Sequence, residues 1–92
     1  MKVVKYVVTK DCKIAMPTGA KIIYVDSLIC GNLQQPNIFL WAEVHTKNQL
    51  QNRHFTIIED DDEINEQHGF NYIGTVNINN YHKHVYEIFK WI

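Results

Sequence analysis

Apolar side chains along this chain recur at every second residue, and this period constrains its fold more than any other feature. No stretch of ten or more residues carries the apolar stripe, at a spacing near 3.6, that an amphipathic helix requires. Alternation within segments rich in β-branched and aromatic residues predicts half-buried strands. The strands expected on this basis are 3–9, 13–16, 21–30, 38–45, 53–59, 70–78 and 83–91.

Turn residues separate these segments. Pro17-Thr18-Gly19 has turn chemistry, 31–37 is a polar loop, and 79–81 joins the last two strands. The longest stretch without a strand pattern precedes Phe70, and one short helical turn is expected there near 63–67. Six or seven short strands predict an all-β fold, either a small antiparallel sandwich or a partly open barrel. A chain of 92 residues has room for a single domain, 1–92.

Charge and composition exclude several classes of function. The formal net charge of -1 argues against a general nucleic-acid binder, which normally carries a basic stripe. The longest apolar runs are far shorter than the roughly 18–20 residues of a membrane span. The first residues do not resemble a signal peptide, and Cys12 and Cys30 do not define a disulfide framework. A cytoplasmic protein in a reducing compartment is therefore expected.

One expected strand, 38–45, is apolar on both of its faces. Phe39 and Trp41 alternate with Leu40 and Val44. An antiparallel sheet in a monomer normally buries one face and exposes the other to water. Either a strongly curved barrel or a second subunit must cover the additional face, and two-fold dimers are the commonest soluble assembly. We expect a homo-oligomer.

The strand expected at 83–91 has the same property, because Phe89 and Trp91 oppose Tyr86 and Ile88.

The strand expected at 21–30 is also rich in apolar residues. Strict alternation would place Ile23 and Val25 on one face, and Ile22 and Tyr24 on the other.

Histidines and acids form two local clusters. His82 and His84 lie two residues apart, a spacing that suits metal ligands, and His45 or His54 would supply a third. The sequence does not bring these strands together and contains no CxxC pair, so surface histidines are the simpler interpretation and no metal site is predicted. Residues 59–63 are all acidic, which is typical of a solvated loop, with an acidic patch for a basic partner as the alternative.

The sequence offers little support for catalysis. Ser27 is the only serine and lacks the glycines of a nucleophile elbow. Gly74 lies inside an expected strand, where a glycine marks a bulge or a close backbone approach rather than a phosphate loop. We predict no catalytic residue, no cofactor and no enzyme.

Binding is the remaining class of function. Phosphate can be paired by cationic side chains, and a base can stack on an aromatic ring. The candidate residues are Lys21, Arg53, His54, His84, Trp41 and Tyr86. For the two rings, a place in the core or at a subunit interface is the competing interpretation.

The order of several short segments resembles a family of small, largely uncharacterised proteins from bacteriophages and their hosts. The matching pieces are residues 16–23 (MPTGAKII), 40–44 (LWAEV), 55–57 (FTI), 70–76 (FNYIGTV) and 84–89 (HVYEIF). Family members tend to continue after the third piece with Gly-Thr-Gly, where this chain has acidic residues instead. The resemblance carries over no catalytic residue.

A bacteriophage protein of this size implies a counter-defence role. The resemblance implies a homo-oligomeric viral protein that sequesters a nucleotide immune signal in the cytoplasm of the host cell. Two alternatives stay open: an inhibitor that binds a host defence enzyme, and a virion or assembly accessory protein.

Overall fold

The computed structural model describes residues 1–28 and 36–89. Within them the chain forms one turn of 3₁₀ helix, η1 (Glu66–His68), and seven strands: β1 (Lys2–Val8), β2 (Cys12–Pro17), β3 (Lys21–Leu28), β4 (Asn37–Val44), β5 (Leu50–Glu59), β6 (Phe70–Ile78) and β7 (Tyr81–Ile88). These strands confirm the all-β prediction. The described residues exclude most of the loop expected at 31–37. They also exclude the end of the strand expected at 21–30, with Cys30, and the end of the strand expected at 83–91.

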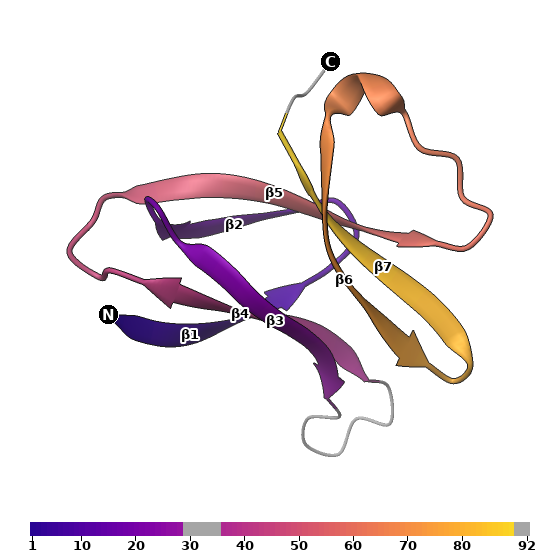
Figure 1. The fold of residues 1–92 in the computed structure, drawn as a ribbon, viewed down its shortest axis with the longest axis horizontal. Coiled ribbons are helices and arrows are strands. Elements are labelled where there is room, and N and C mark those ends of the chain that lie inside the picture. The colour runs from indigo at the N-terminus through magenta and orange to yellow at the C-terminus, as the bar shows by residue number, and fades with distance from the viewer. Residues whose placement is uncertain (29–35, 90–92) are drawn as a thin grey trace.

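The strands form two antiparallel sheets that do not close into a barrel. One has three strands in the order β1-β4-β3, and the other has four in the order β2-β5-β7-β6. In Figure 1 the three-stranded sheet lies at lower left, while the β6–β7 hairpin and the preceding connection extend to the right. β3 packs against β6 where the sheets approach each other.

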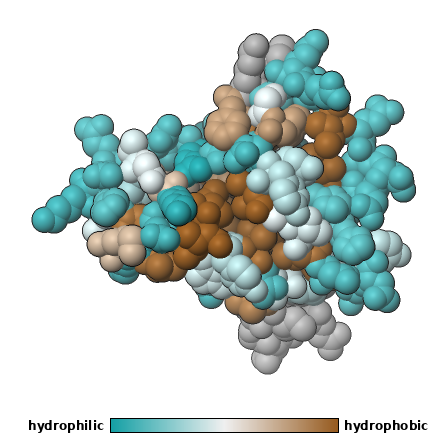
Figure 2. Space-filling model, viewed as in Figure 1, coloured by the Kyte–Doolittle hydropathy of each residue, from teal (hydrophilic) through white to brown (hydrophobic). Residues whose placement is uncertain are grey.

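The core lies between the two sheets. From the three-stranded sheet, Leu40, Ala42 and Val44 of β4 alternate toward it and are fully shielded from solvent. From the other sheet, Phe55 and Val85 do the same. Figure 2 shows hydrophobic side chains gathered across the middle of the molecule, with hydrophilic side chains around the periphery.

A bulge in β3 overturns the strict alternation expected for that strand. The register with β4 shifts between Ile22 and Tyr24, so that Ile22 pairs with Ala42 and Tyr24 pairs with Trp41. The extra residue, Ile23, takes no place in the ladder. Such a bulge restarts the alternation, so Ile22 and the residue after Tyr24 both face the core.

Gly74 confirms the expectation of a bulge or a close approach, since it has both. The register of β6 with β7 shifts between Tyr72 and Gly74. A Cβ at Gly74 would overlap a methyl group of Val25 in β3. The absent side chain is therefore what lets β3 and β6 approach each other, because a stiff β-branched neighbour has few ways to move aside.

The turns also follow their sequence signals. Gly19 has φ +84°, and Asn79 and Asn80 have φ 52° and 68° in the two-residue β6–β7 turn. Residues with positive φ at both positions give the turn whose twist matches a β-hairpin. The helical turn expected near 63–67 begins at Glu66, and Asn65 caps it by accepting a hydrogen bond from the Gln67 N–H at 3.1 Å.

The outer face of β4 carries the second apolar set that the sequence predicts. Trp41 lies beside Tyr24 of β3, with ring centroids 5.5 Å apart, and beside Phe39 at 6.3 Å. The amine of Lys5 lies 4.8 Å from the centroid of the Phe39 ring. β4 is therefore apolar toward the core and also away from it.

The only arginine of the chain forms a buried ion pair. Arg53 of β5 donates two hydrogen bonds of 2.6 Å to the carboxylate of Glu87 in β7, which is 4% exposed. It also donates to the carbonyl oxygen of Ala20, at 2.6 Å, and contacts Met16 of β2. One guanidinium thus contacts both strands that flank β5 and the segment that leads into β3.

Replacing Arg53 by Met should lower the free energy of unfolding by about 3–5 kcal/mol, because it leaves a buried carboxylate without a partner. The double variant R53M/E87L removes that carboxylate as well and should recover a large part of the loss. Urea unfolding of the wild type, both single variants and the double variant measures the coupling. Losses that simply add would show that the two side chains do not stabilise each other.

Candidate functional site

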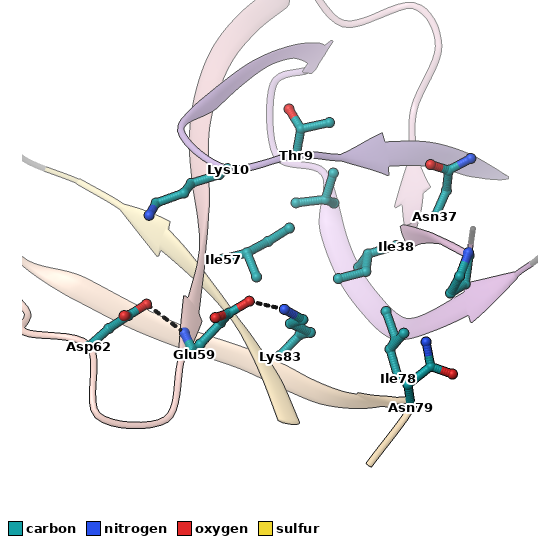
Figure 3. Close-up of a pocket in the computed structure, with 12 residues that line it drawn as sticks. Thr9, Lys10, Asn37, Ile38, Ile57, Glu59, Asp62, Ile78, Asn79 and Lys83 are labelled. Atoms are coloured by element: carbon teal, nitrogen blue, oxygen red, sulfur yellow. Dashed lines mark hydrogen bonds and ion pairs between the residues drawn. The ribbon is translucent and has the colours of Figure 1, made fainter. Parts of the chain in front are cut away.

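A concavity among the described residues lies at one end of the sandwich. There β1 ends, β4 begins, β5 ends, and β6 turns into β7. The cavity has a volume of about 530 Å³, within the usual range of small-molecule sites. Its walls come from all of these strand ends: Val8, Thr9, Lys10, Pro36, Asn37, Ile38, Ile57, Glu59, Asp62, Ile78, Asn79 and Lys83. We call it the end cleft (Figure 3).

The floor of the end cleft is aliphatic. Val8 and Ile38 are register partners at the ends of β1 and β4, and both are buried. Ile57 and Ile78 complete the floor from the four-stranded sheet. Figure 3 shows Ile38 and Ile57 extending toward each other from opposite sides. These are core-facing positions at the strand ends, where Val8 and Ile38 are covered and Ile57 and Ile78 are partly exposed.

The rim of the cleft is polar and charged. Lys83 forms an ion pair with Glu59, and the Asp62 carboxylate accepts a hydrogen bond of 2.9 Å from the Glu59 N–H. Lys10 follows β1 in the tight turn to β2 and makes no ion pair with any residue that the structure describes. The rim therefore offers one cation that remains available to an anionic group.

A second hollow, of about 370 Å³, continues from the end cleft and shares Lys10, Ile57 and Asp62 with it. Its other walls include the ring of Phe70 and the carboxylate of Asp11. Because they share these wall residues, we refer to the two hollows together as the groove.

The acidic run is a structured turn at the edge of this groove. Besides the contacts of Glu59 and Asp62, Asp60 lies between two imidazoles of β7: its Oδ1 is 2.7 Å from His84 Nε2 and its Oδ2 is 3.5 Å from His82 Nδ1. Asp61 has a φ of 69°, a value typical of a tight turn. Three of the five acids thus contact this chain, so the run is more ordered than the self-repelling loop that the sequence predicts.

A chain of hydrogen bonds leads from Asp60 across the outer face of the four-stranded sheet. His84 Nε2 donates to the carboxylate, and its Nδ1 lies 2.9 Å from the Thr75 hydroxyl, which contacts the Tyr72 hydroxyl. The hydrogen bond from His84 lowers the pKa of Asp60 below its ordinary value, and His82 adds to the effect.

The histidines do not converge on a metal site. His54 pairs with Ile88, which lies four residues along β7 from His84, a separation of about 13 Å at the usual rise per residue. His45 follows β4 in the other sheet. Among residues 1–28 and 36–89, no group of three His, Cys, Asp or Glu side chains is arranged to hold a metal ion.

The six binding candidates of the sequence lie in three separate places. Lys21 and Trp41 belong to the outer face of the three-stranded sheet. His54, His84 and Tyr86 share the outer face of the four-stranded sheet, where Tyr86 contacts the rings of Phe70 and Tyr72. Arg53 is committed to Glu87 in the interior.

None of these six candidates lines the end cleft. Sequence reasoning missed the cleft because its residues come from strand ends that are far apart along the chain. The signal that was present is an apolar alternation running to the last residue of a strand, followed at once by a cation, as in Val8-Thr9-Lys10.

Comparison with known proteins identifies a family and no activity. A family model described as "Domain of unknown function (DUF7352)" matches residues 1–90. No curated protein and no solved structure matches the chain. In the described part of the chain, no helix has the length and apolar character needed to traverse a membrane.

The lowered pKa of Asp60 predicts a contribution to acid stability. Because the folded-state pKa lies below the unfolded value of about 4, the charged carboxylate stabilises the fold above that value, and the contribution disappears as the pH falls through the folded pKa. Unfolding of the wild type should therefore depend more steeply on pH below about pH 4 than unfolding of Asp60→Asn. Asp61→Asn is the matched control and should follow the wild type. Parallel curves for wild type and D60N would contradict the role of the His84 contact.

Proposed function

Because the chain belongs to the DUF7352 family, domains of unknown function that supply no activity by analogy, we propose a function from the end cleft. We propose a non-enzymatic binding domain that holds a small ligand with an apolar ring and an anionic group. The observation that supports it is an aliphatic floor beneath a rim whose lysine, Lys10, makes no ion pair with the described residues.

The chemistry of the walls defines the ligand class. An apolar ring would lie against Ile57 and Ile78, the partly exposed residues of the floor, and burial of their apolar surface contributes about 25 cal/mol per Å². Lys10 would pair with a phosphate or carboxylate, and the amides of Asn37 and Asn79 supply donors and acceptors for polar edges. A nucleotide combines these features.

Sequestration is the use that we propose for such a site. A domain of 92 residues that binds a nucleotide and does not convert it would lower the concentration of the free nucleotide. For a protein of bacteriophage type in the host cytoplasm, the corresponding role is counter-defence, with an immune signal as the ligand.

Self-association is part of the proposal. On the face opposite the core, Val3 and Val7 of β1 are about half exposed and Trp41 of β4 is partly exposed, while Phe39 is 9% exposed. A second copy of the chain would remove this surface from water.

The inhibitor alternative draws less support. It would use the acidic run or an exposed strand edge, and within the acidic run Glu59, Asp60 and Asp62 already contact other groups of this chain. No observation favours the virion accessory role.

Titration calorimetry with cyclic oligonucleotides, ADP-ribose-type compounds and mononucleotides tests the cleft. We expect at least one of them to bind, and Lys10→Gln to weaken that binding by about tenfold, the loss of one charge-assisted hydrogen bond.

The matched control is Lys13→Gln, which removes an exposed lysine of β2 that does not line the end cleft. Absence of heat with every compound at high micromolar protein would contradict the nucleotide proposal. Equal losses in the two variants would show that the ligand lies elsewhere.

A further inference from the structure

The outer face of the three-stranded sheet is a regular grid of side chains. The pairing of β4 with β1 and with β3 sets three rows across the sheet. From one end of the sheet to the other, the rows are Val3-Glu43-Lys21, Lys5-Trp41-Tyr24 and Val7-Phe39-Asp26. The bulge in β3 brings Tyr24 and Asp26 onto this face.

This grid combines apolar surface with charges at its ends. Val3, Val7 and Tyr24 are 50%, 49% and 58% exposed, and Trp41 lies at the centre of the face. A basic residue, Lys21, and an acidic residue, Asp26, occupy opposite ends of β3. An exposed apolar patch with a polar or charged border often marks an interaction surface.

We propose that this face is a two-fold interface between two copies of the chain, with the two-fold axis running across the strands at the row of Trp41. This inference rests on the self-association proposed above and identifies its surface and geometry. The partner is a second copy because the grid is complementary to itself.

The apolar positions match under this operation. Rotation about an axis across the strands brings the two sheets face to face. Each strand then lies opposite the same strand of the second copy, and the first row of one copy lies opposite the third row of the other. Val3 then faces Val7 of the second copy, and Trp41 meets Trp41 of the second copy on the axis. Two sheets stacked in this way lie about 10 Å apart, with the strands crossing at about 30°.

The charged positions match as well. Lys21 then faces Asp26 of the second copy, and each such contact occurs twice in the dimer. Glu43 faces Phe39 of the second copy, and the amine of Lys5 lies over that ring at 4.8 Å. The lysine amine of one copy thus approaches the glutamate of the other.

The alternative axis, along the strands, does not give this match. It would place Glu43 against Glu43 of the second copy, and Lys21 against Val3. Like charges at close range in an interface are strongly unfavourable. The proposed axis places Lys5 in the same row as Lys5 of the second copy, but each amine lies away from that row, over Phe39. The charge pattern therefore favours the proposed orientation over the alternative.

Charge exchange tests the interface. Sedimentation velocity or native mass spectrometry should show a dimer for the wild type at micromolar concentration. Lys21→Asp and Asp26→Lys should each weaken dimerisation by about tenfold or more, because each places like charges opposite each other twice. The double variant K21D/D26K exchanges the two ends of β3 and should restore the dimer.

Lys13→Asp, on the outer face of the other sheet, is the matched control and should leave the dimer unchanged. Circular dichroism checks that each variant is folded, since Asp26 also accepts hydrogen bonds from the Ser27 N–H and the Tyr24 hydroxyl. Val7→Glu provides a second disruptive variant, on β1, that leaves those hydrogen bonds in place.

A wild type that is monomeric at high micromolar concentration overturns self-association and this interface together. A dimer that survives both Lys21→Asp and Val7→Glu overturns this interface alone. Neither result bears on the end cleft, whose walls exclude all nine residues of the grid, so ligand binding by calorimetry remains a separate test.

Discussion

The bidentate pair between Arg53 and Glu87 is the interaction on which the rest of this sandwich depends. A buried carboxylate in a small protein is costly unless a fixed cation satisfies it. Here the same guanidinium also donates to the carbonyl oxygen of Ala20 and contacts Met16. It therefore connects β5 and β7 with β2 and with the segment that leads into β3, bringing both sheets together at one end of the molecule.

The opposite end of the β5–β7 pair has a different character. Toward that end the two strands reach Glu59 and Lys83, which form an ion pair at the surface. Among the described residues, Ile57 and Ile78 are partly exposed at that end, where the end cleft lies. The domain is therefore held together by the Arg53–Glu87 ion pair at one end and contains the end cleft at the other.

Much of the fold could be predicted from the sequence because it depends on local rules. The period of two located all seven strands, and the glycine of β6 was correctly interpreted as a bulge and a close approach. The bulge in β3 was missed because Ile22, Ile23 and Tyr24 all suit a strand, and nothing in their chemistry marks the additional residue. Its position depends on which residues of β4 lie opposite.

The site could not be predicted in the same way. Arg53 resembles a phosphate ligand in a sequence with no other arginine, and only the fold shows that Glu87 occupies it. Trp41 and Tyr86 were candidate stacking rings, with the core or a subunit interface as the competing interpretation, and they lie on opposite outer faces. The end cleft combines the ends of strands separated by up to 75 positions, from Val8 to Lys83, a proximity that no local pattern encodes.

The central claim is that the chain is a binding domain which retains a small ligand and does not convert it. Native mass spectrometry of the protein purified from its own expressing or infected cells, under conditions that preserve small ligands, tests this claim most directly. The account predicts a dimer whose mass exceeds twice that of the chain by one small molecule per copy. Fragmentation of the released molecule would show a ring and a phosphate. A clean mass with no bound molecule, in cells that make the ligand, would contradict the account.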